Sequence, residues 1–159
     1  MPSEIVIRCS KLLIEKKLTM AFAESATAGR LSAEFSLVPH CGAMLKGGVV
    51  CYDACIKQDI LMVPEELVAQ YTPESAEVSK AIAEGLAKFM QADVLIGVTG
   101  LTMPGGSETA EKPVGTMFIH AIINGRHLPV REVYQGRPED IVLQTVDRVA
   151  QLLINEINR

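Results

Sequence analysis

Three residues combine the side-chain types and the positions that nucleophilic catalysis needs. Ser25 follows the apolar run of residues 18–23, Tyr52 ends the run 47–52, and Lys57 lies five residues further on. A serine at a helix start faces free N–H groups and a positive dipole end, which stabilise an oxyanion. A lysine can act as the base of such a serine when its surroundings lower its pKa.

Each of the three residues also has a simpler interpretation. Ser25 would then only cap its helix, because serine is a preferred N-cap residue. Lys57 would be a solvated helix residue. Tyr52 would be an aromatic residue at a strand end with its hydroxyl in water.

Glycine pairs are the second group of candidates. In the long loop of residues 100–109, Gly105 and Gly106 allow the backbone to approach a ligand, and their N–H groups can form an anion-binding nest. Gly47 and Gly48 are candidates for the same role. The alternative is a flexible connection. No Gly-Lys-Ser/Thr sequence stands at P-loop spacing.

Alternating helices and apolar strands must position these residues. The hydrophobic spacing predicts helices over 4–16 (capped by Ser3), 25–37, 54–62, from Thr72 to 89, and from Pro138 onward. It predicts strands over 18–23, 47–52 and 94–99, and a hairpin of 115–124 and 128–134 around Asn124-Gly125. This pattern predicts a single α/β domain over residues 1–159, a three-layer α/β/α sandwich with a mixed sheet. Ligands of such sheets gather at the carboxyl ends of the strands.

The composition excludes several classes of function. The net charge is -4, and the chain has no tryptophan and no large Lys/Arg cluster, so we expect no nucleic-acid partner. No apolar run approaches the roughly 18 residues of a membrane span. The first residues lack the pattern of a signal peptide. We therefore expect a cytoplasmic protein without a membrane partner.

The four cysteines allow two interpretations. His40-Cys41 and the Cys51/Cys55 pair suggest zinc, but they lack the paired Cys-x2–4-Cys spacing of structural zinc sites. Reduced cysteines in the protein interior are the commoner outcome in a cytosolic chain. We expect no metal.

A series of motifs in fixed order resembles the CinA C-terminal domain family, the nicotinamide-nucleotide amidases. The motifs extend over nearly the whole chain: Ala23-Glu24-Ser25-Ala26-Thr27-Ala28-Gly29, Gly47-Gly48-Val49-Val50-Cys51-Tyr52, Lys57, Val98-Thr99-Gly100, Pro104-Gly105-Gly106 and Glu111-Lys112-Pro113-Val114-Gly115-Thr116. The sequence departs from the family pattern at Ala26, Ala28 and Met103, which replace a cysteine and two glycines.

The resemblance implies deamidation of nicotinamide mononucleotide to nicotinic acid mononucleotide and ammonia, without a metal or organic cofactor. It places the catalytic serine, tyrosine and lysine on Ser25, Tyr52 and Lys57. The expected oxyanion donors are the N–H groups of residues 25–27. The expected substrate-binding residues are Thr27, Arg30, Lys46, Gly47, Gly48, Thr99, Gly100, Gly105 and Gly106.

Two alternatives to this activity stay open. One is a hydrolase of the same fold acting on another small amide. The other is a non-catalytic domain that binds a nucleotide or a partner. The apolar content, 48% of the residues, also leads us to expect a homo-oligomer.

Overall fold

The computed structural model describes all 159 residues, and its centre is a five-stranded mixed sheet. The strands are ordered β2-β1-β3-β4-β5. The first three in this order are parallel, while β4 and β5 run antiparallel to their neighbours. Their bounds are β1 Met20–Glu24, β2 Leu45–Val50, β3 Val94–Gly100, β4 Thr116–Ile123 and β5 Arg126–Val133.

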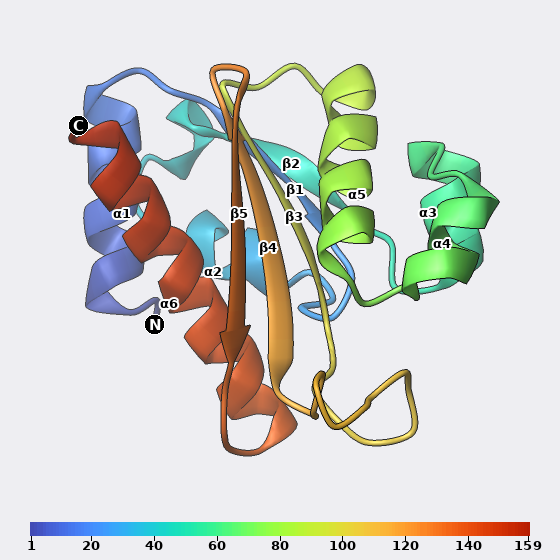
Figure 1. Cartoon of the computed structure of the whole chain (residues 1–159). Coiled ribbons are helices and arrows are strands. Elements are labelled where there is room, and N and C mark those ends of the chain that lie inside the picture. The colour runs from blue at the N-terminus through green and yellow to red at the C-terminus, as the bar shows by residue number, and fades with distance from the viewer.

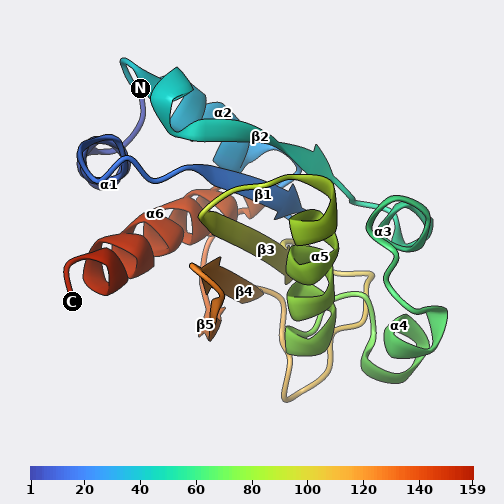
Figure 2. The ribbon, with the colours of Figure 1, turned by 90° about the horizontal axis from the view of Figure 1, so that it is seen from above.

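Helices cover both faces of the sheet, which gives the predicted three layers (Figure 1). One face carries α1 (Glu4–Glu15), α2 (Arg30–Ser36) and α6 (Pro138–Ile157). The other carries α5 (Ala76–Phe89), with α3 (Ala54–Leu61) and α4 (Glu65–Tyr71) beyond it (Figure 2). A short 3-10 helix, Cys41–Ala43, precedes β2. None of these helices combines the length and the apolar character needed to cross a membrane.

Alternation along β1 divides the core into two apolar clusters. Phe22 points into the layer of α1, α2 and α6, where its ring lies 5.5 Å from that of Phe35. Its neighbours Ala21 and Ala23 point toward α5, where Ile82 packs. A shift of one residue in the pairing would exchange these faces, so burial fixes the register of β1 and the position of the residue that follows it.

Most predicted elements are confirmed, including the Ser3 cap, the hairpin and the helix that starts at Pro138. Two predicted helix starts are wrong. The helix expected from Ser25 begins at Arg30, after a turn. The helix expected from Thr72 begins at Ala76, because the Ser75 hydroxyl caps it by accepting from the Val78 N–H.

Candidate functional site

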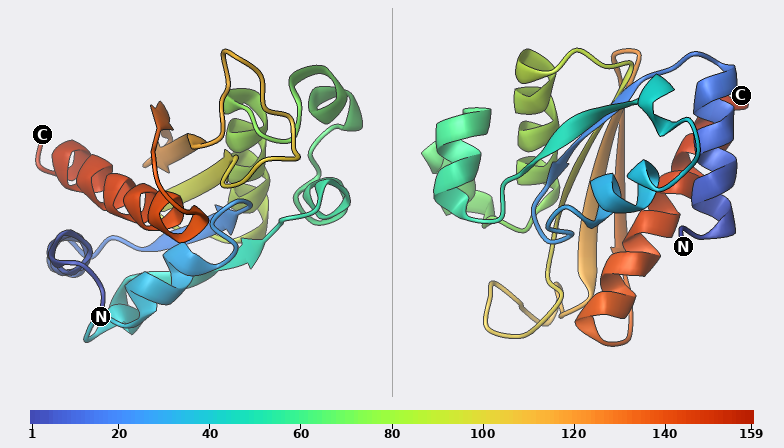
Figure 3. Two further views of the ribbon diagram at one scale, coloured as in Figure 1. Left: turned by 90° about the horizontal axis from the view of Figure 1, so that it is seen from below. Right: turned by 180° about the vertical axis from the view of Figure 1, so that it is seen from behind.

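The carboxyl ends of the three parallel strands bring the predicted catalytic segments together. Glu24, the last residue of β1, is level with Val50 of β2 and Val98 of β3. The N–H of Ser25 donates to the Val98 carbonyl at 2.9 Å, and the N–H of Cys51 donates to the Glu24 carbonyl at 2.9 Å. These bonds fix the main chain just beyond the strands. The loop of residues 101–115 extends past the sheet at the same edge (Figure 3).

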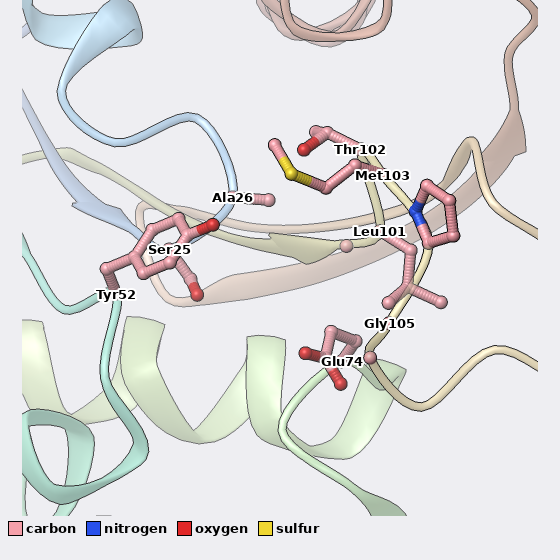
Figure 4. Close-up of a pocket in the computed structure, with 11 residues that line it drawn as sticks. Ser25, Ala26, Tyr52, Glu74, Leu101, Thr102, Met103 and Gly105 are labelled. Atoms are coloured by element: carbon pink, nitrogen blue, oxygen red, sulfur yellow. The ribbon is translucent and has the colours of Figure 1, made fainter. Parts of the chain in front are cut away.

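A pocket of about 270 Å³ opens at this edge (Figure 4). Ser25 and Tyr52 lie together on one side of it, and the loop after β3 forms the other side. Its lining residues come from four segments: Ser25, Ala26, Tyr52, Glu74, Gly100, Leu101, Thr102, Met103, Pro104, Gly105 and Gly106.

Ser25 does not cap a helix, so the simpler interpretation of this residue is wrong. It lies in the turn of residues 25–29, and α2 starts after Gly29. The Ser25 hydroxyl makes no hydrogen bond to any protein group, and the residue borders the pocket. A free hydroxyl at a pocket wall is available to a substrate.

Glu24 supplies the cap that Ser25 was expected to provide. Its buried carboxylate accepts hydrogen bonds from the N–H groups of Leu31 (2.8 Å) and Ser32 (3.0 Å) and from the Ser32 hydroxyl (2.7 Å). A carboxylate is favoured at the positive end of a helix. Our sequence analysis missed this role. A glutamate seven residues before a helix does not match a capping pattern, because only the intervening turn brings its carboxylate to the N–H groups of Leu31 and Ser32.

The turn after Ser25 contains the candidate oxyanion donors. The Ser25 N–H is occupied by the strand bond to Val98, whereas the N–H groups of Ala26 and Thr27 donate to no protein acceptor. The Thr27 hydroxyl oxygen is buried and likewise without a partner. Ala28 follows with φ 47°, in the left-handed region that the next residue also adopts. Two adjacent free N–H groups beside a serine hydroxyl can hold an oxyanion.

Lys57 is fully buried, so the interpretation as a solvated helix residue is wrong. It lies on the inner side of α3, one turn after Asp53, whose side chain caps that helix. Its amine donates to the carbonyl oxygens of Cys51 (2.7 Å) and Tyr52 (3.1 Å). Burial lowers the pKa of Lys57 below its usual value, because desolvation disfavours the ammonium form.

Tyr52 connects Lys57 to the pocket. Its carbonyl accepts from the lysine, whereas its side chain lines the pocket beside Ser25 and is 60% exposed. Lys57 itself does not line the pocket, and no hydrogen bond joins it to Ser25. The three predicted catalytic residues therefore meet around the Cys51-Tyr52 segment, with the tyrosine in the middle.

Five of the nine predicted substrate-binding residues border this region. Gly100, Gly105 and Gly106 line the pocket, and Thr27 and Arg30 line a more open hollow next to it. The guanidinium group of Arg30 is already paired, with Glu34 at 2.7 Å and with Glu139 at 3.4 Å.

The other four lie away from both hollows. Lys46, Gly47 and Gly48 lie within β2, no residue of which lines either hollow. Gly48 instead serves packing, because an added Cβ would lie 2.8 Å from the Phe22 carbonyl oxygen and from the Ser32 hydroxyl. The hydroxyl of Thr99 lies 2.8 Å from that of Ser79 in the interior. None of the four side chains is placed to contact a ligand in the pocket.

The predicted anion nest exists, but a side chain of the protein fills it. The N–H groups of Gly105 and Gly106 each donate, at 2.9 Å, to one oxygen of the Glu108 carboxylate. Gly105 has φ +99°, which a residue with a side chain rarely adopts. The hydrogen bond from Gly105 and the other main-chain bonds lower the pKa of Glu108.

Two further polar residues of the pocket region had no predicted role: Glu74, and Lys112, which was quoted only within a motif. Glu74 lines the pocket from the segment before α5. Lys112 donates to the Thr72 hydroxyl (2.6 Å), the Glu74 carbonyl (2.8 Å) and the Ser107 hydroxyl (2.9 Å). Lys112 thus ties the loop 101–115 to the segment that carries Glu74.

The cysteines do not gather. Cys51 is buried, and desolvation raises the pKa of its thiol to about 11, while Cys55 is exposed. No three His, Cys, Asp or Glu side chains are grouped as metal ligands.

The fold and the site define a class of protein: a three-layer α/β domain with a serine-lined pocket at the carboxyl ends of its parallel strands. The sequence profile of the CinA C-terminal domain matches residues 3–157, so the chain belongs to that family. A CinA-like protein of Dictyoglomus turgidum is 40% identical over 122 residues, 77% of this chain and 29% of that protein. One of Thermotoga maritima is 38% identical over 133 residues, 84% of this chain and 31% of that protein. The chain spans about a third of the length of these relatives.

Solved structures of CinA relatives share the fold over almost the whole chain. A CinA superfamily protein from Klebsiella pneumoniae superposes with a TM-score of 0.92 at 26% identity, covering 98% of this chain and 96% of that one. A competence/damage inducible protein from Agrobacterium tumefaciens gives 0.91 at 26% identity, covering 100% and 99%.

Proposed function

We propose that this chain is an amidohydrolase that converts nicotinamide mononucleotide to nicotinic acid mononucleotide and ammonia. One observation carries the proposal. The Ser25 hydroxyl, which has no hydrogen bond, lines a pocket beside the free N–H groups of Ala26 and Thr27, and Tyr52 lines the same pocket. The carbonyl oxygens of Cys51 and Tyr52 bind the buried amine of Lys57. This combination supplies a nucleophile, oxyanion donors and a proton acceptor.

The reaction is acyl transfer in two halves. Ser25 Oγ attacks the carboxamide carbon, and its proton passes to the neutral amine of Lys57 with Tyr52 orienting or relaying it. The N–H groups of Ala26 and Thr27 hold the oxyanion. The carbon–nitrogen bond then breaks as the nitrogen takes the proton from Lys57 and leaves as ammonia. Water attacks the acyl-serine and gives a proton to Lys57, which returns it to Ser25 Oγ as the carboxylic acid departs.

The test is ammonia release from nicotinamide mononucleotide at neutral pH with a chelator present. We expect release by the wild type and a loss of at least ~10³-fold for Ser25→Ala, the usual effect of removing a nucleophile. Ser36→Ala is the matched control, because Ser36 is exposed at the end of α2 and only binds the Ala33 carbonyl. Equal rates for wild type and Ser25→Ala would contradict the serine mechanism.

Substrate comparison separates the proposal from the two alternatives. Turnover of another small amide in preference to the nucleotide would indicate a different amidohydrolase. Binding of the nucleotide without turnover by the wild type would indicate a non-catalytic domain.

A further inference from the structure

Glu74 carries the one formal charge on the pocket wall. The other ten lining residues are apolar, glycine or neutral polar. Figure 4 shows its carboxylate between Ser25 and Gly105, facing the space where a substrate bound to the serine would lie.

The protein holds this carboxylate on one side only. One oxygen, Oε2, accepts a hydrogen bond from the Ser107 hydroxyl at 2.6 Å, and Oε1 accepts none. The ammonium of Lys112 binds the Ser107 hydroxyl and the Glu74 main chain, and it forms no ion pair with the carboxylate. Glu74 is therefore positioned and still offers one carboxylate oxygen to a ligand.

No positive side chain lines the pocket beside Glu74, and Lys112 reaches its carboxylate only through the Ser107 hydroxyl. Arg30, in the neighbouring hollow, is paired with two glutamates, and Lys57 lies behind Tyr52 with its amine bound to carbonyl oxygens. The N–H groups of Gly105 and Gly106 are occupied by Glu108, and the free N–H groups of Ala26 and Thr27 lie beside Ser25, where they would hold the carbonyl oxygen of the amide. The pocket therefore favours a positively charged ligand group over a negatively charged one.

Resting on the proposed function, we propose that Glu74 is a specificity-determining residue that selects amides carried on a cationic ring. The carboxamide of an N-substituted nicotinamide is attached to a pyridinium ring, which would lie against Glu74 while its carbonyl carbon meets Ser25. Neutral aromatic amides lack this charge.

A pair of ligands that differ in ring charge tests the proposal. Nicotinamide mononucleotide has a cationic ring, and its dihydro form keeps the amide, ribose and phosphate but has a neutral ring. Calorimetric titration of Ser25→Ala protein, which cannot turn over the substrate, should give at least ~10-fold tighter binding of the cationic form. In the double variant Ser25→Ala/Glu74→Gln this ratio should fall to within ~3-fold of one.

Ser25→Ala/Glu77→Gln is the matched control, because Glu77 is exposed in the first turn of α5 and does not line the pocket. It removes the same charge and should keep the binding ratio. Two results would overturn the proposal: a ratio that Glu74→Gln leaves unchanged, including an equal loss for both ligands, which would indicate a hydrogen bond to the sugar, or no binding of the cationic form.

The outcomes separate this proposal from the proposed function. Wild-type protein that binds the cationic form selectively but releases no ammonia keeps the role of Glu74 and refutes the amidase. Ammonia release together with a binding ratio insensitive to Glu74→Gln keeps the amidase and refutes the role of Glu74.

Discussion

The amine of Lys57 lies 2.7 Å from the carbonyl oxygen of Cys51, in a place that solvent does not reach. This position gives the lysine two acceptors for its protons and no counter-ion in direct contact. Burial is the largest cause of its lowered pKa, and it acts against the ammonium form.

The pH dependence of activity should report this lysine. Below its folded pKa Lys57 is an ammonium and cannot accept the Ser25 proton, whereas above it the amine is neutral. We therefore expect kcat/KM to rise with pH through a group titrating below the ordinary lysine value of 10.5. Lys57→Arg, which stays cationic, should lose this rise and about 10²-fold or more of the rate. Lys88→Arg, in the last turn of α5, is the control, and a profile shared by wild type and Lys57→Arg would refute the role.

Removal of the Glu24 carboxylate should destabilise the domain. Glu24→Ala leaves three donors on Leu31 and Ser32 without their acceptor, and we expect a loss of about 3 kcal/mol in the free energy of unfolding. Urea denaturation measures it. Glu4→Ala removes an exposed glutamate from the first turn of α1 and should cost about 0.5 kcal/mol. Similar losses of unfolding free energy for both variants would mean that the buried hydrogen bonds of Glu24 do not stabilise the domain.

Gly85 keeps α3 close to α5, so its substitution should move Lys57. A Cβ at Gly85 would lie 2.1 Å from the Leu61 carbonyl oxygen at the end of α3. We expect Gly85→Ala to destabilise the protein by about 1–3 kcal/mol and to lower kcat more than it raises KM, because the lysine shifts from its acceptors. Gly42→Ala, where a Cβ meets nothing within 4 Å, is the control. Unchanged kcat in folded Gly85→Ala protein would show that α3 tolerates the shift.

Glu108 should compete with a phosphate for the N–H groups of Gly105 and Gly106. Glu108→Ala frees both donors, so we expect a ligand with a phosphate to bind about 3–10-fold tighter, as one recovered charge-assisted hydrogen bond allows. The same ligand without its phosphate should bind as before. Glu111→Ala serves as the control, because that side chain makes no hydrogen bond or ion pair. Weaker binding of the phosphorylated ligand would place its phosphate elsewhere.

The sequence predicted the layers, the mixed sheet and the strand ends that carry Ser25, Tyr52 and Gly100, because apolar periodicity and the direction of parallel strands determine these features. It misplaced the start of α2, since the capping carboxylate of Glu24 acts across a turn that local patterns do not describe. It also assigned Gly47 and Gly48 to a ligand. A glycine required by a neighbouring helix and one required by a ligand look the same in a sequence.

Glu74 and Glu108 could not be predicted for a related reason. Glu74 precedes α5 and Glu108 lies in the loop 101–115, and only the folded path of this loop brings Ser107 against Glu74 and Glu108 against Gly105 and Gly106. The burial of Lys57 depends on the packing of α3 beside α5, which involves residues far apart in the chain.

The order of the strands makes the segment that carries Ser25 more resistant to local unfolding than the segment that carries Tyr52 and Lys57. Ser25 follows β1, which pairs with a strand on each side. Tyr52 and Lys57 follow β2, the edge strand of the sheet, and Lys57 lies in α3. Segments at the edge of a sheet unfold locally far more often than central strands. Heating would therefore unfold the segment of β2 and α3 first and displace Lys57 while Ser25 is still in position. Heat inactivation would then begin as local unfolding of this segment in a domain that otherwise remains folded.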